Sequence, residues 1–337
     1  MTGNGAIRIG LKLFATLALS AVPAAAAPQS YQAPAHLAPV SPLLVAGTPL
    51  DIMRRADEGT QIERDRGPAS ELEEHRKLDR ALQALGAQRD KTVDAYVLSI
   101  ALDSDPVFGR EARVAGDVLS RRYGAAGRTI ILAGTDGSGP SVLPRGAPST
   151  LAIALARIAE LMNRDEDALI LYVTSHGAQF GFSYHDADNG YGAMSPIRLS
   201  AMLDGLGIRN RLLILSACHS GVFVPSLRSD TTAIVTAAAH DRTSFGCVAQ
   251  NDWTFFGDAM INHALRSPQP LAAAFAEAST KVAKWETQFR ITPSQPQVSI
   301  GAGTDRWLGA LERRIPKAIT RPVGRPATET SFPVQVP

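Results

Sequence analysis

The sequence predicts an α/β fold in which a mostly parallel sheet is covered by helices on both faces. Short apolar runs of strand length alternate with segments of helical periodicity along most of the chain. Two of these runs, Ala168–Thr174 and Arg211–Ser216, are almost continuously apolar, which is typical of strands buried on both faces. With 45% hydrophobic and 20% charged residues, the chain can also bury a substantial core.

The elements follow one another in the order expected for strands joined by helical crossovers. Strands are expected at 94–102, 129–133, 168–174, 211–216 and 232–237. Helices are expected at 110–122, 149–162, 196–206, 253–265 and 270–289. Ser149 is a candidate N-cap, and Ser195-Pro196 places a proline at the first position of its helix.

The N-terminal region has the composition of an exported protein. Residues 1–27 resemble a signal peptide, with Arg8 and Lys12 beside an apolar stretch that is too short to span a bilayer, followed by small residues for cleavage. Residues 28–50, rich in proline and alanine, are expected to form a flexible linker. We therefore expect a periplasmic or secreted protein without a stable membrane anchor after cleavage. A retained anchor is the alternative.

The rest of the chain divides into three parts. Residues 51–90 are highly charged, with helical spacing over 69–85, and form a docked helix, a spacer or a removable pro-segment. Residues 91–313 contain the alternating elements and are expected to form the folded domain. Residues 314–337 have several prolines and little apolar periodicity, so we expect a disordered tail.

The charge and cysteine content limit the possible partners. The net charge is only +2, from 34 basic and 32 acidic residues, so nothing indicates nucleic acid or an anionic membrane as a partner. Two cysteines, Cys218 and Cys247, are too few for a disulfide framework, and catalysis is one reason to keep a free thiol. The stretch 186–190 resembles part of a calcium loop but lacks its spacing, so we expect a polar turn and no metal or cofactor.

Two predicted strands end in residues that can carry chemistry. Ala168–Thr174 leads into His176 and Gly177, and Arg211–Ser216 leads into Cys218. If the strands are neighbours, these residues emerge at one edge of the sheet, where functional residues of open α/β sheets gather. An imidazole beside a thiol can accept its proton and later protonate a leaving group. We therefore predict Cys218 as the nucleophile, His176 as its acid–base partner, and the N–H groups of Gly177 and Cys218 as an oxyanion hole.

These motifs resemble those of the legumain family of the caspase-like peptidase clan. The His-Gly and Ala-Cys pairs after apolar strands are shared by the clan, and the block 251–258 around Asp252-Trp253 is similar to the bacterial branch of the family. Segments 107–111 and 241–247 add to a resemblance that covers residues 92–311. It implies a caspase-like three-layer sandwich and a cysteine endopeptidase that cleaves a peptide or protein substrate after Asn or Asp.

The resemblance also implies a specificity pocket. In legumain-type enzymes a basic residue and an acidic residue before tryptophan shape this pocket, and the matching positions here are Arg110 and Asp252. The residue two before the nucleophile, often Glu in legumain, is Ser216, so a strict preference for Asn is not implied. The asparagine near the first strand of plant and animal members has no equivalent, and Asp103 or Asp105 occupies that neighbourhood.

Simpler structural roles are open for several residues. Asp252 can cap the helix expected from Trp253, and Arg110 can be a solvated helix residue. His219 is next to the nucleophile, but neighbouring side chains of an extended backbone point apart, so it is not expected to be the base. Cys247 is expected to be a buried structural thiol.

Three functions remain compatible with these residues. The first is an endopeptidase that acts through an acyl-enzyme. The second is a transamidase or peptide ligase, in which the same dyad passes the acyl group to an amine instead of water. The third is an inactive caspase-like binding module, which the presence of His176, Gly177 and Cys218 disfavours. The oligomeric state is not predicted by the sequence.

Overall fold

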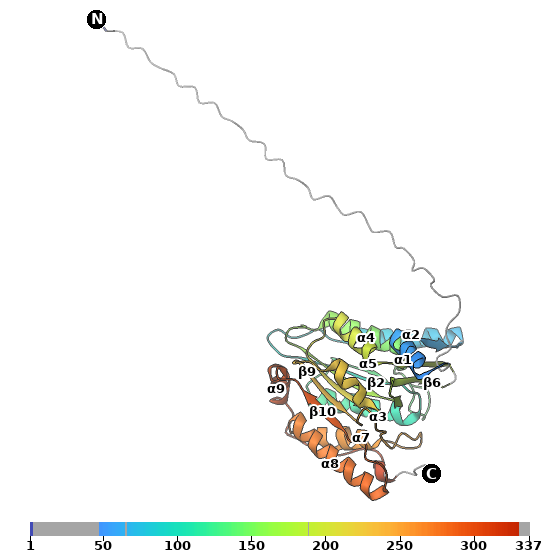
Figure 1. Cartoon of the computed structure of the whole chain (residues 1–337). Helices are drawn as coiled ribbons and strands as arrows, with labels where there is room; N and C mark the ends of the chain where they lie inside the picture. Colours follow the sequence, from blue (N-terminus) through green and yellow to red (C-terminus); the bar gives the residue numbers. More distant parts are fainter. Residues whose placement is uncertain (3–46, 65, 188, 330–337) are drawn as a thin grey trace. The chain divides into compact units, whose positions relative to one another are not determined.

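A six-stranded sheet forms the centre of the folded unit in the computed structural model, which describes residues 1–2, 47–64, 66–187 and 189–329. The strand order is β10-β9-β8-β4-β2-β3 (Figure 1). All neighbours are parallel except β10, which runs antiparallel to β9. The strands are β2 (Ala95–Ala101), β3 (Thr129–Leu132), β4 (Ala168–Thr174), β8 (Arg211–Ser216), β9 (Thr232–Thr236) and β10 (Gln297–Ile300).

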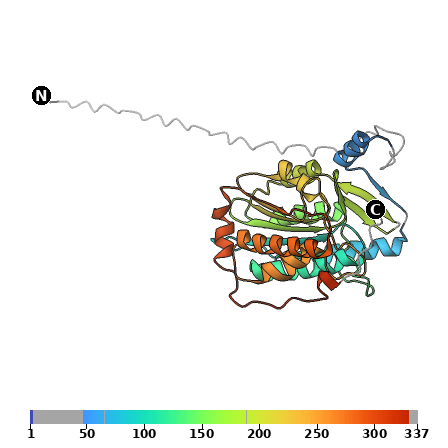
Figure 2. The same cartoon turned by 60° about the horizontal axis from the view of Figure 1, so that its bottom comes forward.

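Helices cover both faces of this sheet because its strands bury side chains on both sides. Along β4, Ile170 and Tyr172 face one core, whereas Leu169 and Leu171 face the other. The first core lies against α3 (Pro106–Arg122) and α8 (Leu271–Phe289). The second lies against α2 (Pro68–Gln83), α4 (Pro148–Leu161) and α5 (Pro196–Gly205). Figures 1 and 2 show the two groups of helices on opposite sides of the sheet, so the predicted three-layer sandwich is confirmed.

A second, antiparallel sheet follows directly after β4. Its strand order is β1-β7-β6-β5, and the polar stretch 186–190 begins with the last residue of β6 and ends with the first residue of β7. These strands are short and rich in glycine, which explains why the apolar pattern did not predict them. They are β1 (Gln61–Glu63), β5 (Gly177–Ala178), β6 (Gly181–Asp186) and β7 (Gly190–Met194).

The charged segment 51–90 is packed onto the domain. Leu78 of α2 and Leu85 after it are buried in the second core. Strand β1 pairs with β7, and the guanidinium of Arg145 donates to both carboxylate oxygens of Glu71 at 2.9 Å. The expected docked helix is therefore observed.

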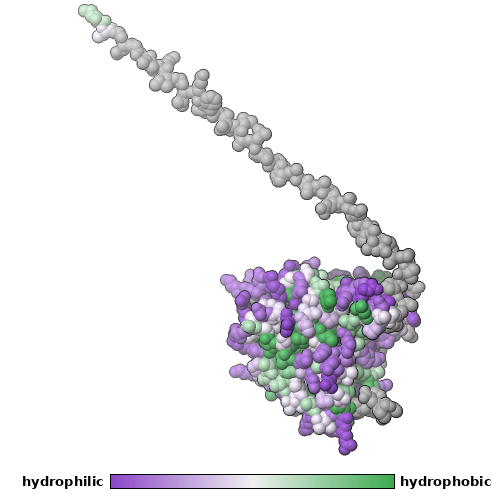
Figure 3. All heavy atoms as spheres, in the orientation of Figure 1, coloured by the Kyte–Doolittle hydropathy of each residue, from purple (hydrophilic) through white to green (hydrophobic). Residues whose placement is uncertain are grey.

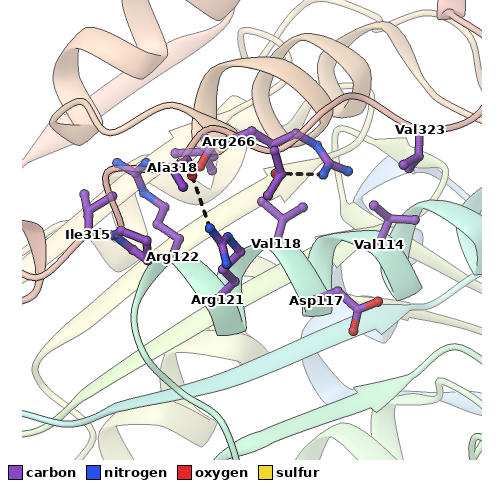
Figure 4. Close-up of a pocket in the computed structure, with 12 residues that line it drawn as sticks. Val114, Asp117, Val118, Arg121, Arg122, Arg266, Ile315, Ala318 and Val323 are labelled. Atoms are coloured by element: carbon purple, nitrogen blue, oxygen red, sulfur yellow. Dashed lines mark hydrogen bonds between the residues drawn. The ribbon is translucent and has the colours of Figure 1, made fainter.

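The C-terminal segment differs from the prediction of disorder. Residues 314–329 lie against α3, where Arg121 donates to the carbonyl oxygen of Ala318 at 3.2 Å (Figure 4). Between this segment and α3 is a cavity of about 370 Å³ that none of the predicted site residues lines. Ala327 is completely buried. Side chains of the domain hydrogen-bond to the backbone of this segment, as Asn262 does to Val323 and Asp258 to Ala327. The predicted disorder is therefore wrong for 314–329, and residues 330–337 lie outside the described residues.

The observed first residues of two helices differ from the predicted ones. Helix α4 begins at Pro148 rather than being capped by Ser149, since proline is already suited to the first helical position. The linker expected over 28–50 ends before Thr48, whose hydroxyl caps α1 (Pro49–Glu58). The rest of that linker lies outside the described residues.

The helix expected over 253–265 is broken into shorter turns. It begins as α7 (Phe255–Gly257) and continues as a π-helical turn, Asp258–His263. The hydroxyl of Thr254 caps α7 by accepting a hydrogen bond from the Gly257 N–H at 2.9 Å. Asp252 is therefore not the cap.

The surface of the described unit is mixed in character. Figure 3 shows polar and charged residues around smaller apolar patches on one face. Among the described residues, no helix is long and apolar enough to cross a membrane. The predicted signal peptide, apart from residues 1–2, lies outside the described residues.

Candidate active site

The carboxyl ends of β4 and β8 bring His176 and Cys218 to one edge of the sheet. The two strands are direct neighbours, with Thr174 paired to Ser216. Immediately beyond this pair, the N–H of Ser175 donates to the carbonyl oxygen of Ser216 at 3.2 Å. The two strands are therefore neighbours, as the prediction from the sequence required.

Gly177 allows the two chain segments to approach this closely. A Cβ atom at this position would lie 2.3 Å from the carbonyl oxygen of Cys218 and 3.0 Å from the Cβ atom of Ala217. Such contacts exclude any side chain, which gives Gly177 a steric role in addition to its predicted place in the oxyanion hole. Within the described residues, the backbone N–H of Cys218 has no hydrogen-bond acceptor.

The sulfur of Cys218 is surrounded by groups that favour a thiolate. The backbone N–H of Ser244 donates to it at 3.2 Å. Hydrogen bonding with the Cys247 side chain is the largest of the effects that lower the pKa of Cys218 to about 6; the Ser244 bonds and the charge of His176 add to it, and burial opposes it. The same interaction, together with burial, raises the pKa of Cys247. Cys218 is therefore the more acidic of the two thiols.

His176 is held by an aromatic ring and a carboxylate from the start of α3. Its ring lies edge-on to Phe108, with centroids 5.0 Å apart and an interplanar angle of 83°. Its Nε2 atom is 3.5 Å from Oδ2 of Asp105. The His176 side chain is 40% exposed, so a substrate can reach it. Helix α3 thus fixes the orientation of the imidazole.

A second carboxylate lies beside this pair. Asp103 follows β2 and is buried, and burial raises its pKa. Asp103, Asp105 and His176 each offer a ligand atom within 4.8 Å of the others, so they are the described residues that could hold a metal ion. A carboxylate this close to His176 can also orient its imidazole. Of the two acidic residues expected in this neighbourhood, Asp105 is the one in contact with Nε2 of His176.

A buried carboxylate that the sequence analysis did not single out connects the parts of the site. Glu111 of α3 has no exposed surface, and it accepts five hydrogen bonds. Three come from the hydroxyls of Tyr172, of Thr174 at 2.9 Å and of Ser216 at 3.0 Å. The other two come from the N–H and the hydroxyl of Thr254, at 2.8 and 2.9 Å. Glu111 therefore joins the strands that precede the histidine and the cysteine to the loop before α7.

The sequence contained one signal for this role. Val107, Phe108, Ala112 and Ala115 belong to the buried face of α3, and Glu111 lies on the same face. A carboxylate among apolar helix positions requires hydrogen-bond donors. Its donors come from three separate segments, which only the folded structure brings together.

Ser216 points into the protein interior. It is 2% exposed, and its hydroxyl lies 3.3 Å from that of Thr254 in addition to its bond with Glu111. The alternation of β8 side chains directs position 216 toward α3. Ser216 therefore anchors the end of β8 and does not line an open pocket. Position 216 lacks the glutamate that legumain often has there, but the carboxylate of Glu111 from α3 contacts the Ser216 hydroxyl.

Arg110 and Asp252 come together, as the resemblance implied. Arg110 Nε lies 3.5 Å from Asp252 Oδ1, and both residues line a pocket of about 230 Å³. The other oxygen of Asp252 accepts a hydrogen bond from the N–H of Arg325 at 2.7 Å. The Arg110 guanidinium also donates to backbone carbonyl groups, those of Asp136, Ala249 and Asn251. Arg110 is thus a bonded residue rather than a solvated one.

His219 has a separate environment from the nucleophile beside it. Its backbone is left-handed, with φ of 57°, and its ring Nδ1 lies 3.0 Å from the carbonyl oxygen of His240. This contact occupies one of the two ring nitrogens. The extended backbone on which the expectation for His219 relied is not observed.

A cysteine and a histidine at the carboxyl edge of a parallel, helix-covered sheet define the class of cysteine peptidases to which the sequence was similar. The sequence model of the Peptidase C13 family matches residues 148–302, a range that includes both residues. This part of the chain is therefore similar to the legumain family, and the match supports a cysteine peptidase.

Several solved structures resemble the chain at low identity. Caspase-1 from Spodoptera frugiperda is 14% identical, with a TM-score of 0.42, over 64% of this chain and 92% of that chain. A structure of pro-sf-caspase-1 is 13% identical, with a TM-score of 0.38, over 63% and 92%. The drICE structure is 12% identical, with a TM-score of 0.35, over 63% and 89%. No curated protein matches the chain.

The hydrogen bonds of Glu111 predict a large effect of its removal. Glu111→Leu should lower the free energy of unfolding by several kcal/mol, because each buried donor left unpaired costs about 1–3 kcal/mol. Glu111→Gln, which keeps one acceptor oxygen, should be less destabilising. Urea unfolding measures both. Glu160→Leu is the control, since that side chain is 66% exposed. Equal effects at the two positions would contradict the role of Glu111.

The hydrogen bond from Cys247 predicts a change in the titration of Cys218. Iodoacetamide should alkylate wild-type Cys218 with a midpoint near the lowered pKa of about 6. Cys247→Ala removes the donor and should raise this midpoint by about one pH unit. Cys247→Ser, which retains a donor, should raise it less. An unchanged midpoint in Cys247→Ala, or faster alkylation of Cys247 than of Cys218 in the wild type, would disprove the assignment.

Proposed function

We propose that this protein is an exported cysteine endopeptidase in which Cys218 attacks the peptide carbonyl and His176 transfers the protons. The observation that carries this proposal is the environment of the Cys218 sulfur. Its lowered pKa, about 6, makes the thiolate the main form at neutral pH, and the thiolate is the nucleophilic form. The exposed imidazole of His176 follows the neighbouring strand at the same sheet edge. Export rests on the signal-like residues 1–27.

The reaction follows from the roles of these groups. The thiolate attacks the carbonyl carbon, and the N–H groups of Cys218 and Gly177 donate to the oxyanion that forms. His176, which holds the proton taken from the Cys218 thiol, then protonates the leaving amine as the C–N bond breaks, and an acyl-enzyme thioester remains. Water hydrolyses the thioester while His176 accepts its proton. Asp105 keeps the imidazole in the orientation that both transfers require.

We place the side-chain preference in the pocket that Arg110 and Asp252 line. A donor and an acceptor side by side suit the neutral carboxamide of Asn, which has both an N–H₂ group and a carbonyl oxygen. An ionised Asp side chain would lie near the carboxylate of Asp252, which disfavours it until it is protonated. Cleavage after Asn at neutral pH, with Asp accepted only in acid, is therefore the proposed specificity.

A peptide library tests both the reaction and the specificity. Purified mature protein should cleave after Asn near neutral pH, and Cys218→Ala should abolish cleavage. Arg110→Ala and Asp252→Ala should each lower kcat/KM for Asn peptides by about ten- to a hundredfold, as expected for the loss of a buried hydrogen-bond partner. The alkylation of Cys218 should persist in both variants.

Mass analysis of the products with and without an added amine separates the possible reactions. Hydrolysed products alone support the endopeptidase, whereas amide products identify a transamidase. An unchanged preference for basic or bulky apolar residues in both variants would remove Arg110 and Asp252 from the pocket.

A further inference from the structure

The C-terminal segment is fixed in place by buried side chains of the loop and turns around α7. The indole N–H of Trp253 donates to the carbonyl oxygen of Val323 at 2.8 Å. The amide of Asn262 exchanges two hydrogen bonds with the backbone of Val323, at 3.0 and 2.9 Å. The carboxylate of Asp258 accepts a hydrogen bond from the N–H of Ala327 at 2.8 Å. The path of this segment is therefore defined by the folded domain.

The same segment forms one side of the pocket that Arg110 and Asp252 line. Val323 and Gly324 are among the residues around that space of about 230 Å³. The N–H of Arg325 donates to Oδ2 of Asp252 at 2.7 Å, and Nε of Arg325 lies 3.8 Å from the same oxygen. Oδ1 of Asp252 faces Arg110 instead, at 3.5 Å. The carboxylate is therefore held between α3 and the C-terminal segment.

A short loop connects this pocket to the nucleophile. At one end, the backbone N–H of Ser244 donates to the Cys218 sulfur at 3.2 Å. At the other, the side chain of Asn251 donates to the carbonyl oxygen of Gly246 at 2.8 Å. The carbonyl oxygen of Asn251 accepts a hydrogen bond from Nε of Arg110 at 3.1 Å. The pocket is thus placed for the substrate side chain next to the bond that Cys218 would attack.

We propose that Gly324 and Arg325 determine the specificity of this pocket, Gly324 by leaving space beside Asp252 and Arg325 by balancing its charge. This assignment rests on the proposed peptidase function and deepens it, because it adds a wall from the C-terminal segment to the substrate pocket. The substrates that fit are peptides with a short carboxamide or carboxyl side chain at the cleaved residue.

Gly324 has a backbone conformation and surroundings that exclude a side chain. Its φ of +76° lies in the left-handed region that favours glycine. A Cβ atom would lie 3.1 Å from Oδ2 of Asp252 and 3.1 Å from Nε1 of Trp253, and both of these residues line the pocket. A larger residue at this position would therefore displace the carboxylate or narrow the pocket.

Arg325 places positive charge on the outer side of Asp252. Its side chain is 60% exposed, whereas that of Asp252 is 26% exposed. Arg113 and Asp136 also line the pocket, and their charged groups lie 3.8 Å apart, so they offset each other. Without Arg325, an acidic substrate side chain would meet Asp252 with only Arg110 to offset the repulsion.

Peptidase kinetics of two glycine variants of the full mature protein test the role of Gly324. Gly324→Ala should raise KM for Asn peptides by about tenfold and change kcat by less than about twofold, as expected when binding alone is weakened. Gly127→Ala is the matched control, because its φ is +74° and no heavy atom beyond its chain neighbours lies within 4 Å of the added Cβ. Iodoacetamide should alkylate Cys218 equally fast in both variants. Equal KM values in the two would overturn the role of Gly324.

Charge selectivity tests Arg325 independently of Gly324. Arg325→Glu should lower kcat/KM for Asp peptides relative to Asn peptides by about threefold at mildly acidic pH, since it adds negative charge beside Asp252 at a partly exposed position. Arg321→Glu makes the same charge change at another exposed position of the segment and should leave this ratio unchanged. Equal ratios in the two variants would overturn the role of Arg325.

Failure of the proposed peptidase function would be seen separately. A wild type that cleaves no Asn peptide, or cleavage that survives Cys218→Ala, would contradict that function and with it the use of this pocket for substrate. Wild-type cleavage after Asn, together with variants that match their controls, would overturn the roles of Gly324 and Arg325 alone.

Discussion

The buried carboxylate of Glu111 is the interaction on which the arrangement of this site depends. A fully buried carboxylate is costly unless donors surround it, and here five hydrogen bonds from β4, β8 and the loop before α7 satisfy it. Those elements carry His176, Cys218 and Asp252, respectively. Because α3 also supplies Phe108 and Asp105 directly precedes it, the same helix and its N-terminus position both the imidazole and the ends of the strands.

The two cysteines form a second, electrostatic unit at the same edge. The pKa of Cys218 is lowered and that of Cys247 is raised, so Cys218 is the more acidic thiol of the two.

The sequence predicted the central strands and the Cys–His pair because these features are local. Apolar runs gave β4 and β8 their observed bounds, and parallel strands place their carboxyl ends at one edge. Three features depend on distant contacts and were missed or misread. These are the donors of Glu111, the inward orientation of Ser216, and the packing of residues 314–329, which side chains of the domain hold by hydrogen bonds to its backbone. The short glycine-rich strands β5 to β7 were missed because they lack an apolar pattern.

The central claim is that Cys218 forms a covalent acyl-enzyme with peptide substrates, and mass analysis of a quenched reaction tests it most directly. The protein is mixed with an excess of an Asn-containing peptide ester, acid-quenched before steady state, and digested for adduct mapping. The account predicts a thioester on Cys218 that hydroxylamine removes, and its accumulation should be much slower in His176→Ala. An adduct on another residue, or turnover without any adduct in both proteins, would contradict it.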